Sequence, residues 1–139
     1  MGGGDGFLVD HLLMMGFKDI TVLDISSSAI SKAKRRLGSN SSIVKWVVAD
    51  ICKFIPKKKY DLWHDRAAFH FLTEPNEINR YKRTAETYIK DNGNLIIGTF
   101  SKNGPLKCSG LNITQYSQMS LYELFKDKFK IIESFQTDH

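Results

Sequence analysis

Three glycines stand at alternate positions near the start of the chain, as Gly2, Gly4 and Gly6, and we call residues 2–6 the glycine loop. Glycine lets a backbone turn sharply and approach a ligand that any Cβ would block. The next apolar run ends in an acidic residue, Asp24. A carboxylate at the tip of the strand after such a loop can accept both hydroxyl groups of a ribose. The loop and the acid together predict a site for a nucleotide-type cofactor.

The spacing of the glycines narrows the kind of cofactor. A dinucleotide-binding loop reads G-x-G-x-x-G, and counted from Gly2 its last glycine would fall on Phe7. The alternation found here lacks the extra residue that brings a pyrophosphate onto the N-terminus of the following helix. This disfavours a nicotinamide or flavin dinucleotide.

A second acidic residue, Asp50, follows the apolar run 47–49. The glycine loop, Asp24 and Asp50 together resemble the pattern of class I S-adenosylmethionine-dependent methyltransferases, and the resemblance covers nearly the whole chain. It implies S-adenosylmethionine as the cofactor and S-adenosylhomocysteine as the product. It also implies methyl transfer to a small molecule or a protein side chain by in-line displacement, in which the protein mainly aligns and desolvates the reactants.

The resemblance further implies a role for each residue of the cofactor site. The glycine loop would lie under the amino-acid and ribose parts of the cofactor, and Asp24 would hold the ribose hydroxyls. Asp50 would meet the adenine amino group, with Ile25 and Ile51 lining the ring. Asp65, just after the strand-like run 60–64, would face the methionine portion or the incoming substrate.

The segment after residue 64 also carries the candidate catalytic residues. A nucleophile that starts protonated needs a base nearby, and His70, His64 or Asp65 could serve. For a lone histidine such as His70, core packing or a structural hydrogen bond is the favoured interpretation. Arg66 could bind a substrate carboxylate bidentately, or it could pair with Asp65 and shape the loop, and the structural pair is slightly favoured.

Apolar strand-like runs alternate with amphipathic helical segments. Strands are expected at 20–25, 43–50, 60–64, 94–100 and 129–135, and helices at 5–15, 29–37, 75–90 and 121–125. Serines 26–28 supply a helix cap, Gly16 and Gly38 end helices, and residues 91–93 make a turn into the strand that follows. This order predicts a doubly wound, mostly parallel, Rossmann-like α/β sheet, whose ligands bind beyond the carboxyl ends of the strands.

Two features depart from the family pattern. The family's glycine loop follows its first strand, whereas this chain begins at Met1 where that strand should finish. The chain also stops at His139, before the family's usual last strand and hairpin. The expectation is therefore a single methyltransferase domain over 1–139 that is incomplete at both ends. Without the central strand, two neighbouring strands would have unpaired edges, which a second copy of the chain could cover as a homo-oligomer.

Composition sets wider limits. A chain of 139 residues with 42% hydrophobic residues can bury one core. Cys52 and Cys108 are far apart and form no C-x-x-C pair, so neither a disulfide framework nor a metal site is expected. No apolar stretch has membrane-spanning length, and no secretory signal pattern is present. The expected location is the cytoplasm, with no membrane partner.

The net charge of +5 leaves a further hypothesis open. Many of the cations lie between residues 32 and 59 and could bind RNA or another polyanion. Because the two densest groups of cations, at 32–36 and 57–59, contain no interleaved aromatic residues, a solvated helix face and a charged loop are the favoured explanation. Three hypotheses therefore stand: a methyltransferase, a non-catalytic fragment or partner subunit with the same fold, and an RNA-binding or RNA-modifying protein.

Overall fold

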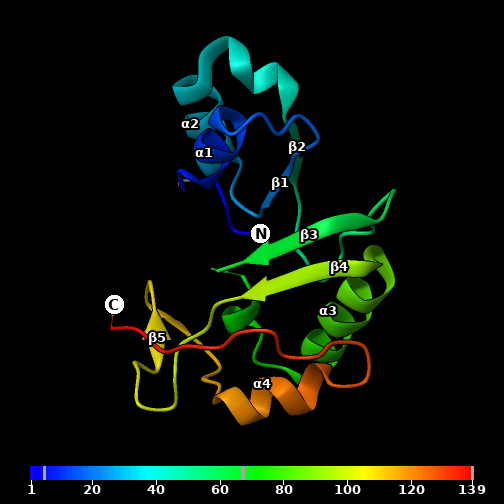
Figure 1. Cartoon of the computed structure of the whole chain (residues 1–139). Helices are drawn as coiled ribbons and strands as arrows, with labels where there is room; N and C mark the ends of the chain where they lie inside the picture. The colour runs from blue at the N-terminus through cyan, green and yellow to red at the C-terminus, as the bar shows by residue number, and fades with distance from the viewer. Residues whose placement is uncertain (5, 67, 139) are drawn as a thin grey trace. The chain divides into compact units, whose positions relative to one another are not determined.

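The computed structural model describes residues 1–4, 6–66 and 68–138. The chain divides into two compact units, unit 1 from Met1–Ile55 and unit 2 from Pro56–His139 (Figure 1). Each unit holds one parallel pair of strands. The predicted single domain over 1–139 stays a prediction, whereas the predicted parallel α/β character is present in both units.

Unit 1 is built from helices that alternate with two parallel strands. Its elements are α1 (Leu8–Met14), β1 (Thr21–Asp24), α2 (Ser27–Leu37), a 3-10 turn (Gly38–Ile43) and β2 (Lys45–Val48). Strands β1 and β2 pair in parallel, with Thr21 opposite Lys45 and Asp24 opposite Val48. The buried side chains of Val9, Val22 and Val44 form a small core between helix and strands.

The helix boundaries of unit 1 follow the predicted signals. Ser26 caps α2 by accepting a hydrogen bond from the Ala29 N–H at 3.2 Å. Gly16 and Gly38 take positive φ values of 90° and 59° after the two helices, a conformation that favours glycine. The predicted start of the first helix at Asp5 lies outside the described residues.

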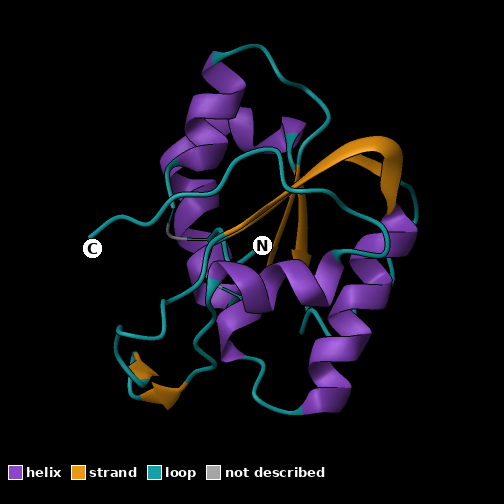
Figure 2. Ribbon diagram, turned by 60° about the horizontal axis from the view of Figure 1, so that its bottom comes forward, coloured by secondary structure: helices purple, strands orange, loops and turns teal. Residues whose placement is uncertain are grey.

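Unit 2 begins with β3 (Tyr60–Asp65) and a short 3-10 turn (Phe69–Phe71), followed by α3 (Pro75–Tyr88) and β4 (Ile89–Ile97). Strands β3 and β4 are parallel. Next come β5 (Lys107–Cys108) and β6 (Leu111–Asn112), which form a small antiparallel hairpin of their own (Figure 2), and then α4 (Gln118–Phe125).

The predicted turn at 91–93 lies inside β4 as an irregularity. Tyr60 pairs with Ile89 but Leu62 pairs with Asn94, so the register shifts between these two positions. Gly93 stands at the shift, where an added Cβ would lie 2.7 Å from the Ile89 side chain and 2.9 Å from the Asp61 carbonyl oxygen. A glycine here lets the two strands close around the extra residues.

Aromatic side chains form the centre of unit 2. Phe69 is fully buried, and its ring centroid lies 4.7 Å from that of Tyr81, 5.1 Å from Tyr116 and 5.8 Å from Phe125. This packing joins the turn after β3 to helices α3 and α4. The buried ring of Phe69 therefore holds this turn against α3 and α4.

The predicted last strand at 129–135 is wrong, since these residues form no strand. Their β-type residues are exposed instead, with Ile132 at 79% and Phe135 at 81% of full exposure. A strand needs a partner ladder as well as apolar residues, and none pairs with this segment in the described part of the chain. Among the described residues, helices of membrane-spanning length and apolar character are also absent.

Candidate functional site

The glycine loop of unit 1 is tied to β1 by its backbone. The Gly2 N–H donates to the Leu23 carbonyl oxygen at 3.0 Å. Within the loop, the Gly6 N–H donates to the Gly3 carbonyl oxygen at 3.2 Å, which closes a tight turn. The loop therefore lies at the carboxyl end of β1, as the sequence predicts.

Gly4 is the position where the loop most needs a glycine. An added Cβ would lie 2.6 Å from Ala29 Cβ and 3.1 Å from Asp24 Oδ2. At Gly6 the nearest atom to an added Cβ would be the Gly3 carbonyl oxygen, at 3.7 Å. The first turn of α2 thus requires a glycine at position 4, whereas the protein's own packing leaves room at position 6.

Asp24 joins the loop, the strand and α2 through one carboxylate. Its Oδ2 accepts the Gly4 N–H at 3.1 Å, and its Oδ1 accepts the Ser26 N–H at 2.8 Å. A carboxylate has about four acceptor positions, so each oxygen can still accept a further donor. The half-buried Asp24 is thus oriented by the chain and keeps acceptor capacity for a pair of hydroxyl groups.

The ends of β1 and β2 lie together, as predicted for the two acidic residues. The Ala49 N–H donates to the Asp24 carbonyl oxygen at 3.1 Å. Asp50 follows, and its Oδ1 accepts the Cys52 N–H at 2.9 Å, which shapes the turn after β2. Both acids are therefore at the carboxyl edge of this strand pair.

The two isoleucines predicted to line the adenine ring differ in exposure. Ile25 is 73% exposed and offers an apolar surface next to Asp24, whereas Ile51 is only 6% exposed. The lining roles of both residues stay predictions. The exposure of Ile25 leaves its side chain accessible to a ring, whereas the burial of Ile51 argues for packing.

In unit 2, Asp65 is fully buried and holds the turn that follows β3. Its Oδ1 accepts the N–H groups of Ala68 at 2.9 Å and Phe69 at 3.3 Å, and its Oδ2 accepts the Tyr81 hydroxyl at 2.8 Å. Trp63 Nε1 donates in turn to the Tyr81 oxygen at 3.2 Å. The predicted contact of Asp65 with cofactor or substrate stays a prediction, and these bonds argue for a positioning role.

Burial, reinforced by the neighbouring Asp65, raises the pKa of Tyr81 well above its ordinary value. Tyr81 therefore keeps its proton and remains a donor to the carboxylate. Arg66, by contrast, is exposed, and no ion pair joins it to Asp65 among the described residues. The backbone and Tyr81 already donate to the buried carboxylate, and the role of Arg66 stays a prediction.

His70 is a buried side chain, only 4% exposed. Its ring centroid lies 4.4 Å from that of Phe71 and 5.2 Å from that of Phe100. Neither ring nitrogen has a hydrogen-bond partner in the described residues. Burial lowers the pKa of His70, so the imidazole is neutral near neutral pH. Buried, unpaired nitrogens are rare and call for an explanation.

The segment before α4 is hydrogen-bonded to the turn that carries His70. The Thr114 N–H donates to the His70 carbonyl oxygen and its hydroxyl to the Leu72 carbonyl oxygen, each at 2.8 Å. Tyr116 is buried against Phe69, and burial raises the pKa of Tyr116 to about 12. Tyr116 thus contributes to the aromatic core of unit 2.

The chain is similar to proteins of one known family over nearly its whole length. A family model described as a methyltransferase domain matches residues 1–137. The chain belongs to this family. The predicted class, the Rossmann-like S-adenosylmethionine-dependent methyltransferases, is thereby confirmed.

Curated relatives of this methyltransferase domain are longer proteins. The chain is 31% identical over 143 aligned residues to malonyl-[acyl-carrier protein] O-methyltransferase 2 of Ilyobacter polytropus, covering 95% of this chain and 54% of that protein. It is 34% identical over 104 residues to malonyl-[acyl-carrier protein] O-methyltransferase of Anoxybacillus flavithermus, covering 72% and 37%. The chain thus spans about half the length of the first relative.

Solved structures show the same fold. N-methyltransferase NodS from Bradyrhizobium japonicum, in complex with S-adenosyl-L-homocysteine, matches with a TM-score of 0.71 at 17% identity, over 91% of this chain and 61% of that chain. The 1,6-didemethyltoxoflavin-N1-methyltransferase of Burkholderia thailandensis matches with a TM-score of 0.71 at 18% identity, over 91% and 56%. The predicted fold class is confirmed.

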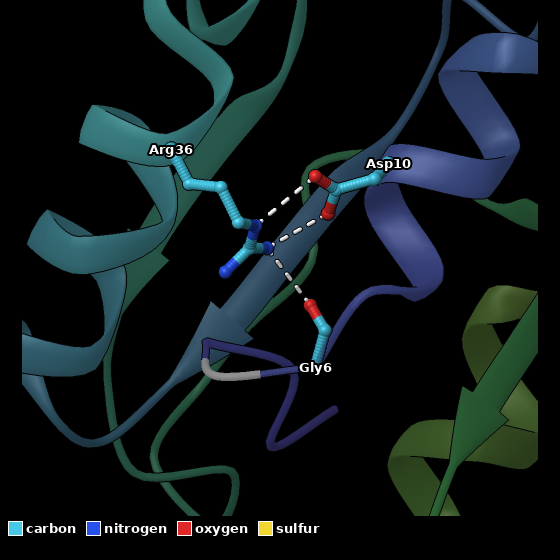
Figure 3. A network of polar contacts seen from close by, with 3 residues as sticks. All are labelled: Gly6, Asp10 and Arg36. Carbon is cyan, nitrogen blue, oxygen red and sulfur yellow. Dashed lines mark hydrogen bonds and ion pairs between the residues drawn. The ribbon is translucent and has the colours of Figure 1, made fainter.

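Sequence reasoning about this methyltransferase domain missed two partners. Tyr81 reaches Asp65 from α3, and Arg36 reaches the glycine loop from the end of α2 (Figure 3). Both are separated from their partners by many residues, and no local motif signals such pairs. Clusters of His, Cys, Asp or Glu that could hold a metal ion are not found in the described part of the domain.

Replacing Tyr81 by Phe should lower the free energy of unfolding by about 1–3 kcal/mol, because a buried carboxylate loses its donor. Tyr88→Phe, in the same helix, is the control, since its hydroxyl makes no hydrogen bond in the described residues. Urea unfolding of both variants measures the difference. Equal losses in the two variants would contradict the structural role given to Tyr81.

Stability should fall as the pH is lowered below about 6.5. Burial lowers the pKa of His70 from its ordinary 6.5, so the unfolded chain binds a proton before the folded chain does. The stabilising contribution is therefore complete above about 6.5 and is lost as the pH falls toward the folded-state pKa. His70→Phe should reduce this pH dependence in urea unfolding. His64, whose pKa burial also lowers, should supply the remainder. An unchanged slope in His70→Phe would refute this assignment.

Proposed function

We propose that this chain binds S-adenosylmethionine at the glycine loop and uses it for methyl transfer. The observation that carries the proposal is the Asp24 carboxylate, held by the N–H groups of Gly4 and Ser26 with acceptor capacity to spare. A ribose presents two adjacent hydroxyl donors, which such a carboxylate can accept together. The accepting carboxylate of unit 1 thus fits the ribose of the family's cofactor.

The other residues of unit 1 complete the proposed cofactor site. The bend of the glycine loop brings backbone rather than side chains to the ligand, next to Asp24. The exposed Ile25 provides an apolar surface for the adenine ring, and Asp50 at the neighbouring strand end accepts the adenine amino group. This assignment keeps the predicted role of every cofactor-site residue in unit 1 except Ile51.

The bound cofactor supplies a methyl group already activated by a sulfonium. In-line attack by an acceptor atom would break the carbon–sulfur bond, and the sulfur would keep the electron pair. The protein therefore contributes alignment and exclusion of water more than bond chemistry.

For the acceptor, we propose a carboxylate on an acyl group. The two curated relatives are named for O-methylation of malonyl groups on acyl-carrier protein. A carboxylate is already deprotonated, so its methylation requires no base. The exposed guanidinium of Arg66 can bind such a carboxylate bidentately.

A protonated acceptor such as an amine would instead lose a proton to a base. His70 is the candidate base in unit 2, because it is neutral and its ring nitrogens are unpaired. Its ring is covered by Phe71 and Phe100, so contact with a substrate requires these side chains to move. The choice of acceptor therefore decides whether His70 has a chemical role.

The cofactor proposal is tested by titrating S-adenosylmethionine into the full chain by calorimetry. Asp24→Ala should weaken binding by about 10- to 100-fold, because two hydrogen bonds to a charged group are lost. Asp19→Asn, an equal charge change on an exposed residue before β1, is the control and should bind as the wild type does. Circular dichroism confirms that each variant is folded. A folded wild type that does not bind, or an Asp24→Ala variant that binds equally well, would contradict the proposal.

The acceptor proposal is tested by assaying methyl transfer to a malonyl thioester of acyl-carrier protein, with amines in parallel. His70→Phe should retain most of the kcat on the carboxylate acceptor, since no proton is removed. On an amine acceptor, His70→Phe should lower the kcat by about 100-fold or more. Turnover of amines alone, with loss of that turnover in His70→Phe, would overturn the carboxylate proposal.

The two other hypotheses stay predictions. The basic region 32–59 could bind RNA, and salt-sensitive retention on RNA would favour that function. A partner subunit without its own activity, a homo-oligomer and a location in the cytoplasm likewise rest on the sequence alone.

A further inference from the structure

Arg36, in the last turn of α2, contacts the glycine loop and the helix that follows it (Figure 3). Its Nε donates to Asp10 Oδ1 at 3.0 Å and its Nη2 to Asp10 Oδ2 at 2.7 Å. The same Nη2 donates to the Gly6 carbonyl oxygen at 3.0 Å. One planar guanidinium thus binds a carboxylate with two bonds and a loop carbonyl with a third.

The ring of Phe7 completes this arrangement. The guanidinium carbon of Arg36 lies 4.6 Å from the Phe7 ring centroid, within the range of a cation–π contact. The side chains of Arg36 and Asp10 are only 26% and 23% exposed, so the pair is partly shielded from water. The hydrogen bond from Arg36 also lowers the pKa of Asp10, which keeps the carboxylate charged at neutral pH.

Arg36 provides a third hydrogen bond between the glycine loop and another element, and the glycines give this loop high conformational freedom. The first two hydrogen bonds, from Gly2 to Leu23 and from Gly4 to Asp24, both lead to β1. The third holds the far end of the loop at Gly6 and comes from a different element, α2. Glycines lose more conformational freedom on ordering than other residues, so a loop fixed in advance binds a ligand with a smaller entropic loss.

The bond to Gly6 also sets the direction of one peptide group. The peptide bonds of the described residues are trans, so the carbonyl and the N–H of a peptide point in opposite directions. When the Gly6 carbonyl faces Arg36, the Phe7 N–H faces away from it. No hydrogen bond of this N–H is found within the described residues. The donor is therefore available to a ligand at the loop.

We propose that Arg36 is a positioning residue for cofactor binding, which fixes the end of the glycine loop through Gly6 and Asp10. The inference rests on the proposed use of this loop for S-adenosylmethionine. A salt bridge that only joined α1 to α2 would need the Asp10 carboxylate alone. The hydrogen bond to the Gly6 carbonyl oxygen is the contact of Arg36 that holds the glycine loop itself.

The test compares Arg36→Ala with Arg35→Ala in the full chain. Arg35 is the adjacent exposed cation on α2, and contacts of its side chain with the loop are absent from the described residues. Arg36→Ala should weaken S-adenosylmethionine binding by about tenfold in calorimetry, whereas Arg35→Ala should leave it unchanged. Arg36→Lys should fall between, because an ammonium cannot reproduce the fork. Asp10→Asn, which keeps the hydrogen bond from Arg36 to Gly6, should lose less affinity for S-adenosylmethionine than Arg36→Ala does.

To distinguish the positioning role from a purely stabilising one, binding is measured at a temperature well below the unfolding midpoint of every variant. Nearly every molecule is then folded, so a loss of stability does not change the Kd. Hydrogen exchange of the amides of residues 4–8 in the free chain adds a readout without ligand, and Arg36→Ala should speed it relative to Arg35→Ala. Equal affinity in Arg36→Ala and Arg35→Ala, or unchanged exchange, would overturn the inference. A folded wild type that fails to bind would instead overturn the proposed function, and hydrogen exchange would still decide whether Arg36 holds the loop.

Discussion

The carboxylate of Asp24 is the interaction on which the cofactor-binding unit depends. It binds the backbone of the glycine loop through Gly4 and the start of α2 through Ser26, while its own backbone ends β1. The loop can approach this closely because Gly4 has no Cβ to collide with Ala29. One side chain therefore sets the geometry of three elements and, in our proposal, that of the ligand.

Unit 2 uses a second carboxylate for a comparable purpose. Asp65 is buried, and buried charge is costly unless its hydrogen bonds are satisfied. Tyr81 and the N–H groups of the turn satisfy it, and the turn then carries His70. Both carboxylates hold backbone N–H groups, but the half-buried Asp24 keeps room for a ligand in our proposal, whereas Asp65 is fully buried.

Much of the fold and part of the site were predictable from the sequence because the signals are local. Serine caps, terminal glycines and the strand-end acids each act within a few residues, and the structure confirms the cap at Ser26 and the stop at Gly38. The strand expected at 129–135 failed because a strand depends on a distant partner. The contacts of Arg36 with Gly6 and of Tyr81 with Asp65 are also long-range, so no local pattern could reveal them.

The most direct test of the central claim is an amide NMR titration of the full chain with S-adenosylhomocysteine. If Asp24 and the glycine loop form the cofactor site, saturable shifts should centre on the amides of Gly2, Gly4, Gly6 and Ser26. Shifts that leave these amides unchanged, or an absence of saturable shifts in a folded chain, would contradict the account.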